Sequence, residues 1–152
     1  MKLNGKTALV SGSTQGIGKA VALKLAEMGA KVVLLARNEE KLKAVLKELS
    51  TENQQNHEYL VADFANPSEL KQKIETYLSG GNRIDILVNN TGGPKAGLAI
   101  DADISEFLAA FNQHLICNHI LVQALVPGMK QLGGGRIINV ISTSVKQPLP
   151  GL

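Results

Sequence analysis

The sequence predicts an α/β fold of three layers, in which helices cover both faces of a doubly wound parallel sheet. Short apolar segments recur along the chain, and helical patterns of apolar residues lie between them. Each short segment is apolar throughout instead of alternating with polar residues, which is typical of parallel strands buried on both faces. The predicted strands are 7–10, 32–35, 59–61, 84–88 and 137–141.

The first three helices are predicted from apolar residues spaced three or four positions apart. Gly29 marks the end of the first helix, and Asn66 followed by Pro67 marks the start of the third, as a cap residue and a first helical residue. The expected core faces are Ile17, Val21, Leu25 and Met28 in the first helix, Leu42, Val45, Leu46 and Leu49 in the second, and Leu70, Ile74 and Leu78 in the third.

The fourth helix is predicted to begin near Asp103, with Glu106 in its first turn. From Leu115 to Val126 it is apolar on nearly every side. This pattern predicts burial against a neighbouring subunit as well as against the sheet, and hence a homodimer or homotetramer formed through this helix. A wholly intramolecular central helix accounts for the same pattern equally well.

Composition limits the classes of protein to consider. With 152 residues, 44% of them hydrophobic, we expect one domain spanning 1–152. No apolar run reaches the roughly 18 residues that a membrane-spanning helix needs, so no membrane association is expected. The net charge is +3, but only 3% of residues are aromatic, which argues against nucleic-acid binding. A single cysteine, Cys117, and a polar N-terminus predict a cytoplasmic location.

A glycine-rich turn separates the first strand from the first helix, with glycines at positions 12, 16 and 18. Three glycines there permit a tight bend, close approach of the backbone to a pyrophosphate, and close packing of the helix on the strand. Since this turn lies in a strand–turn–helix context, it predicts a dinucleotide-binding, Rossmann-type fold. A merely structural turn is the alternative.

The residues after the second strand indicate which dinucleotide is bound. In such folds an acidic residue about 20 positions after the glycines binds the adenosine ribose hydroxyls. Here Ala36, Arg37 and Asn38 stand in that region, and no carboxylate precedes Glu39. The Arg37 guanidinium could bind a ribose 2′-phosphate, so NADP (NADPH) is expected over NAD. A solvent-exposed arginine at a helix start is the alternative.

Three further segments extend this pattern. Asp63 follows the third strand, Asn89-Asn90-Thr91-Gly92 follows the fourth, and 135–142 ends in Ser142. With the spacing Gly-x-x-x-Gly-x-Gly, these segments resemble the short-chain dehydrogenase/reductase family along the entire chain, and the beta-ketoacyl-acyl-carrier-protein reductase type within it. The resemblance implies an NADP-dependent oxidoreductase that interconverts a small carbonyl compound and a secondary alcohol by hydride transfer.

The resemblance also implies the site residues. Ser142 is the catalytic residue it identifies, and no metal site is expected, because His114 and His119 are five residues apart on a helix. The implied cofactor-binding residues are Gly12, Ser13, Thr14, Gln15, Gly16, Ile17, Gly18, Arg37, Asp63, Phe64, Asn90, Thr91 and Gly92.

Two departures from the family pattern weaken the catalytic assignment. The family's Tyr-x-x-x-Lys pair would follow Ser142 by about a dozen residues, which is past Leu152, and Tyr59 and Tyr77 are predicted to lie too far away to replace it. We therefore expect an incomplete chain whose sheet lacks its last covering helix at the C-terminus. His114 stands where the family has a proton-relay asparagine. The alternative function is a dinucleotide-binding sensor or partner subunit without catalysis.

Overall fold

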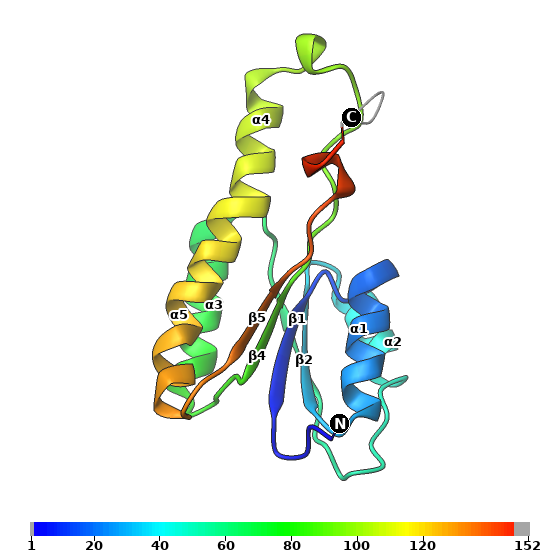
Figure 1. Cartoon of the computed structure of the whole chain (residues 1–152), viewed down its shortest axis with the longest axis vertical. Coiled ribbons are helices and arrows are strands. Elements are labelled where there is room, and N and C mark those ends of the chain that lie inside the picture. Colours follow the sequence, from blue (N-terminus) through cyan, green and yellow to red (C-terminus); the bar gives the residue numbers. More distant parts are fainter. Residues whose placement is uncertain (1, 148–152) are drawn as a thin grey trace.

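The computed structural model describes residues 2–147 and has the predicted three-layer α/β architecture (Figure 1). Five parallel strands form one sheet in the order β3-β2-β1-β4-β5. The chain runs outward from β1 to β3 and then returns to place β4 on the other side of β1, which makes the β1–β4 boundary a topological switch point. The strands are β1 Thr7–Ser11, β2 Lys31–Ala36, β3 Glu58–Val61, β4 Ile86–Asn89 and β5 Arg136–Asn139.

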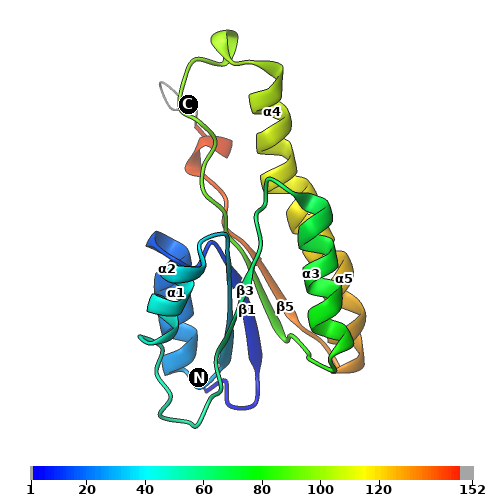
Figure 2. The same cartoon turned by 180° about the vertical axis from the view of Figure 1, so that it is seen from behind.

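The helices lie on both faces of the sheet. Figures 1 and 2 show α1 and α2 on one face, α3 and α5 on the other, and α4 extending past the carboxyl ends of the strands. The α-helices are α1 Gly16–Glu27, α2 Glu39–Leu46, α3 Pro67–Ser79, α4 Ile104–Phe111 and α5 Cys117–Gln131. The remaining turns are η1 Ala99–Asp101, the π-helical η2 Asn112–Ile116 and η3 Thr143–Val145.

Helix α1 packs through a different face from the predicted one. Ile17 is 60% exposed, and Val21, Leu25 and Met28 are only half-buried. The buried residues of this helix are Gly18, Ala22 and Ala26. Small side chains allow the helix axis to approach β1 and β2 closely, and the larger apolar residues are then displaced to the margin of the interface. Apolar periodicity alone did not show that the small residues form the contact.

The other predicted core faces agree with the structure. Leu42, Val45 and Leu49 are buried around α2, and Leu70 and Ile74 are buried on α3. The remaining predicted residues, Leu46 and Leu78, are half-buried and pack against the core. The predicted start of α3 is confirmed, because the Asn66 side chain accepts a hydrogen bond from the Glu69 backbone N–H at 3.2 Å and Pro67 is the first helical residue. Strand ends differ from prediction by one or two residues. None of the described helices is long and apolar enough to span a membrane.

The predicted fourth helix is interrupted. The π-helical turn η2 separates α4 from α5, and only α5 buries a continuous face, formed by Cys117, Leu121, Leu125 and Met129. Such a turn inserts one extra residue per turn and rotates the face that follows it. The apolar side chains of α4 are left largely exposed, whereas in the segment 115–126 Leu121 and Leu125 are buried and Leu115 is exposed. Burial of this segment against a neighbouring subunit stays a prediction.

Candidate functional site

A cavity of about 620 Å³ lies at the carboxyl ends of the strands, next to the topological switch point. Four loops contribute to it, one after each of β1, β2, β3 and β4. Its lining residues are Gly12, Thr14, Gln15, Gly16, Ile17, Ala36, Arg37, Asn38, Lys41, Ala62, Asp63, Phe64, Asn90, Thr91, Gly92, Gly93 and Gln113. Open α/β sheets bind ligands in this position.

The structure brings most of the predicted cofactor residues together. All of them line the cavity except Ser13 and Gly18, and the predicted catalytic residue Ser142 does not line it either. The cofactor residues implied by the sequence did not include Ala36, Asn38, Lys41, Ala62, Gly93 and Gln113, which also line it. For Lys41 a signal existed in the sequence, since it follows Arg37 by four residues on a helix start.

The glycine turn is fixed by close backbone contacts. A Cβ at Gly12 would lie 2.5 Å from the Asn90 carbonyl oxygen, and a Cβ at Gly18 would lie 2.2 Å from the Gly12 carbonyl oxygen. Gly12 and Gly16 both have positive φ angles, of 59° and 54°. Gly18 therefore acts by packing the start of α1 against the turn, which explains why it does not face the cavity.

Two serines hold this turn to the neighbouring strands. The Ser13 hydroxyl is buried and accepts a hydrogen bond from the Leu35 N–H at 3.1 Å. The Ser11 hydroxyl accepts from the Asn90 N–H at 2.9 Å, and the Asn90 side-chain amide donates to the Ser11 and Gly12 carbonyl oxygens, each at 3.3 Å. Ser13 is thus placed as a structural residue, and Asn90 both shapes the turn and borders the cavity.

The amino terminus of α1 differs from those of α2, α3 and α4. Its N-cap residue, Gln15, makes no side-chain capping bond, and its first turn contains no acidic residue. By contrast α2, α3 and α4 are capped by the side chains of Asn38, Asn66 and Asp103. The first N–H groups of α1 therefore lack a side-chain acceptor at the cavity edge, an arrangement that suits a bound phosphate group.

His114 lies within the π-helical turn and contacts the loop after β4. Its Nδ1 is 2.7 Å from the Thr91 hydroxyl oxygen, and its carbonyl oxygen accepts from the Asn118 side-chain amide at 2.7 Å. The partner of the His114 ring is therefore the side chain of Thr91 and not a backbone group. The contact joins η2 to a residue that borders the cavity.

Ser142 lies after β5, at the same edge of the sheet as the cavity. It is exposed and caps the short helix η3, where its hydroxyl oxygen accepts from the Ser144 N–H at 3.1 Å and from the Ser144 hydroxyl at 2.8 Å. The hydroxyl is accessible to a ligand, but the structure does not place it in the lining of the described cavity.

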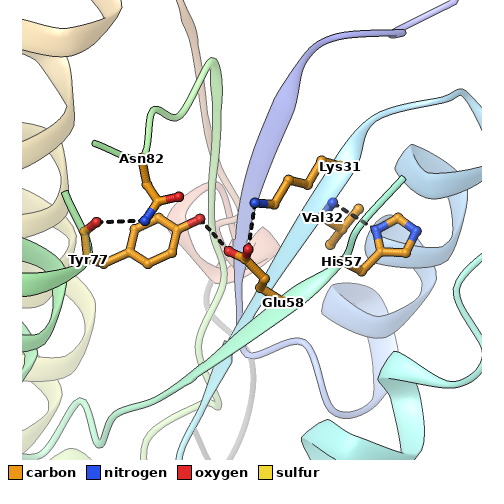
Figure 3. Close-up of polar contacts among 6 residues, drawn as sticks. All are labelled: Lys31, Val32, His57, Glu58, Tyr77 and Asn82. Carbon is orange, nitrogen blue, oxygen red and sulfur yellow. Dashed lines mark hydrogen bonds and ion pairs between the residues drawn. The ribbon is translucent and has the colours of Figure 1, made fainter. Parts of the chain in front are cut away.

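Neither tyrosine is available to this edge of the sheet. The Tyr59 hydroxyl donates to the Glu39 carboxylate at 3.0 Å, and the Tyr77 hydroxyl donates to the Glu58 carboxylate at 2.8 Å, where Lys31 also binds (Figure 3). The hydrogen bond to Glu39 raises the pKa of Tyr59, and burial, followed by the hydrogen bond to Glu58, raises the pKa of Tyr77. Phenols held in this way are poor proton donors, and both lie away from the end of β5, as the sequence predicted.

Cys117 is a packing residue. It is fully buried, and its thiol donates to the Phe64 carbonyl oxygen at 3.2 Å. Burial, and then the nearby charge of Asp63, raises the pKa of Cys117 to about 11. Within residues 2–147 no group of His, Cys, Asp and Glu side chains is arranged to hold a metal ion.

Comparison with known proteins identifies relatives along the whole chain. A family model described as short chain dehydrogenase matches residues 6–152. The chain is 36% identical to hydroxysteroid dehydrogenase-like protein 1 of Gallus gallus and 33% identical to inactive hydroxysteroid dehydrogenase-like protein 1 of Homo sapiens. Both alignments cover 100% of this chain and 46% of the relative. The chain therefore spans about half the length of these curated relatives.

Solved structures show the same similarity. L-Sorbose reductase from Gluconobacter frateurii, complexed with NADPH and L-sorbose, matches with a TM-score of 0.91 at 32% identity, covering 99% of this chain and 57% of that one. A metagenomic short-chain oxidoreductase in complex with NADP matches with a TM-score of 0.87 at 34% identity, covering 97% and 66%. A putative betaketoacyl-ACP reductase has a TM-score of 0.85 at 28% identity, covering 99% and 59%.

Proposed function

This chain belongs to the short-chain dehydrogenase family, and from that premise we propose that it binds NADP(H) for the interconversion of a small carbonyl compound and a secondary alcohol. The observation that carries the proposal is the cavity at the switch point, which is lined both by the uncapped start of α1 and by Arg37. Two structural relatives are described with NADPH or NADP, which supports the choice of dinucleotide.

The residues of the cavity fit the parts of a dinucleotide. The first N–H groups of α1 would bind the pyrophosphate, as helix amino termini bind anions. Arg37 would bind the ribose 2′-phosphate through charge-assisted hydrogen bonds, and Asp63 with Phe64 would border the adenine. Thr91 and Gly92 line the part of the cavity after β4, next to η2.

The chain's own residues would position the reacting groups. The nicotinamide, when bound, supplies or accepts the hydride. Ser142 would orient the substrate oxygen with its hydroxyl, and His114 would keep the loop after β4 in place through Thr91. We assign no proton donor within residues 2–147, because the hydroxyls of Tyr59 and Tyr77 bind carboxylates elsewhere.

A second candidate function is dinucleotide binding without turnover, as in a sensor or partner subunit. It is favoured by His114, which stands where the family pattern has an asparagine, and by the human relative, whose name describes that protein as inactive. The two candidates share the cofactor site and differ only in turnover.

Three narrower features are also proposals. The names of the relatives cover a sugar reductase, a putative ketoacyl reductase and hydroxysteroid dehydrogenase-like proteins, and among these we favour the ketoacyl type as the substrate class. We propose association of two or four copies through α4, whose apolar side chains are exposed. We also propose a cytoplasmic location, which fractionation of cells would test.

The test combines binding with turnover in the intact protein. NADPH and NADH are titrated by calorimetry, and oxidation of NADPH is then followed with a panel of ketones, ketoacyl thioesters and keto sugars. Tight NADPH binding with oxidation supports the oxidoreductase, whereas tight binding without oxidation supports the non-catalytic alternative. If neither nucleotide binds, both functions are refuted.

A matched pair of variants tests the cavity itself. Arg37→Ala should weaken NADPH binding by roughly 10- to 100-fold, because hydrogen bonds to charged groups contribute about 1.5–3 kcal/mol. Lys47→Ala, which removes an exposed cation at the far end of α2, should leave the affinity unchanged. Equal effects of the two substitutions would contradict the assignment of Arg37.

A further inference from the structure

Two cations that are four residues apart in the sequence line the cavity. Arg37 follows β2 and Lys41 lies in the first turns of α2, and both line the cavity. Within residues 2–147 neither side chain forms an ion pair with a carboxylate. The cavity therefore carries two positive charges that no protein group neutralises.

Lys41 differs in this respect from the lysines around it. Lys19 pairs with Glu48 at 2.8 Å, and Lys43 pairs with both Glu39 and Glu40 at 3.1 Å. These lysines are already occupied and none of them lines the cavity. Among the described residues, Lys41 is therefore the lysine that lines the cavity and forms no ion pair.

The nearest carboxylate after Arg37 is held away from the cavity. Glu39 accepts hydrogen bonds from the Tyr59 hydroxyl at 3.0 Å and from the Lys43 ammonium at 3.1 Å, and it does not line the cavity. Hydrogen bonds from Lys43 and then from Tyr59 lower the pKa of Glu39, so the carboxylate is ionised at neutral pH. An ionised Glu39 turned toward Arg37 would repel a phosphate group there.

We propose that Lys41 is a second cation for the ribose 2′-phosphate, beside Arg37, and that Tyr59 and Lys43 position Glu39 away from that phosphate. The proposal rests on the proposed function. A phosphate monoester carries a charge of about −1.5 to −2 at neutral pH and three terminal oxygens. A bidentate guanidinium uses two of those oxygens, which leaves charge and an acceptor for an ammonium group. Lys41 would thus favour NADP over NAD.

The experiment measures dissociation constants by calorimetry on the intact protein, with four probes: NADPH, NADH, 2′,5′-ADP and 5′-AMP. Lys41→Ala should weaken binding of NADPH and 2′,5′-ADP by roughly 10- to 100-fold, the size of one hydrogen bond to a charged group, and leave NADH and 5′-AMP unchanged. Lys47→Ala, on the same helix and outside the cavity, is the matched control and should change none of the four.

A second set of variants tests the positioning of Glu39. Tyr59→Phe removes one hydrogen bond to the Glu39 carboxylate and should weaken NADPH selectively, by roughly 2- to 5-fold, the size of a modest electrostatic effect. Adding Glu39→Gln should restore the affinity, because the repelling charge is gone. A purely structural role of Tyr59 would weaken NADH and NADPH alike and would not respond to the second substitution.

The possible results separate this proposal from the function it rests on. If the protein prefers NADPH and loses that preference in Arg37→Ala, but Lys41→Ala behaves like Lys47→Ala, the role of Lys41 is overturned and the proposed function stands. If the unaltered protein binds NADPH no better than NADH, the proposed NADP preference is itself overturned, and Lys41 with it.

Discussion

At the scale of single residues, the shape of the site depends on glycines, which have no side chain, and on side chains that pack in the interior. Gly18 shows this most directly, because there is no room for a methyl group between α1 and the turn: a Cβ would lie 2.2 Å from the Gly12 carbonyl oxygen and 2.6 Å from the Asn90 side-chain nitrogen. The first atom is backbone and cannot move without displacing the turn. The start of α1 is thus fixed by steric exclusion.

Gly18→Ala is therefore expected to lower the free energy of unfolding by roughly 1–3 kcal/mol, the usual cost of forcing extra volume into a packed site. Urea denaturation followed by circular dichroism measures this difference. Gly97→Ala is the control, since a Cβ at Gly97 would have no atom within 4 Å. Equal stability of the two variants would show that the turn adjusts without cost.

The thiol of Cys117 supplies a second prediction at this scale. Since burial raises the pKa of Cys117 to about 11, very little thiolate exists near neutral pH. Iodoacetamide at neutral pH should therefore modify Cys117 slowly in the folded protein and rapidly in urea, as measured by mass spectrometry of the peptide that contains it. Rapid modification of the folded protein would contradict the buried position of the thiol.

At the scale of elements, one carboxylate joins two strands and a helix. Glu58 on β3 accepts hydrogen bonds from Lys31 on β2 at 2.7 Å and from Tyr77 on α3 at 2.8 Å (Figure 3). Burial alone would raise the pKa of Glu58, but the hydrogen bonds from Lys31 and Tyr77 outweigh it, and the pKa is lowered. The contacts connect α3 to the edge of the sheet formed by β3.

Glu58→Gln is expected to destabilise the protein by about 1 kcal/mol at neutral pH, a typical value for a partly buried hydrogen-bonded group. Because the pKa of Glu58 is lower in the folded state, its contribution is complete above the unfolded pKa of about 4.3 and is lost as the pH falls through the folded value. The difference in the free energy of unfolding between Glu58→Gln and the unaltered protein should therefore shrink in acid, as measured by urea denaturation across pH.

Glu75→Gln is the control, since its pairing with Lys71 is exposed and long, at 3.9 Å. A difference that stays constant into acid would contradict the assignment.

The secondary-structure elements also show which features could be predicted from the sequence and which could not. The positions of the strands, their burial on both faces and the cap of α3 could be predicted, because each depends on a local pattern of a few residues. The packing face of α1 could not, because it depends on how closely the helix approaches the sheet. The π-helical turn at Asn112–Ile116 was not predicted either, and its His114 contacts Thr91, which is distant in the sequence. Lys41 follows Arg37 by four residues, but Arg37 precedes the first residue of α2, so only the folded structure shows that both side chains line the cavity.

At the scale of the whole molecule, four loops from one edge of the sheet form the candidate site, and α4 rises beyond that edge (Figure 1). The parallel strands bring together the loops at their carboxyl ends, which come from distant parts of the sequence. On α4 the side chains Ile104, Phe107, Leu108 and Phe111 share one helical face and are 55–76% exposed. A contiguous apolar stripe of this kind is typical of a surface that contacts another protein surface.

If copies associate through α4, a charge on this stripe should separate them. Phe107→Glu and Phe111→Glu place a carboxylate among apolar side chains, whose burial would be costly, so each is expected to reduce the molar mass measured by light scattering after size exclusion. Ala109→Glu is the matched control, because position 109 lies away from the stripe on the same exposed helix.

A lower mass for the phenylalanine variants alone would support an interface at α4, since the added charge is the same in all three proteins. An unchanged mass in all of them would contradict an interface on this stripe, and an equal decrease in all would attribute the effect to charge on the helix as a whole.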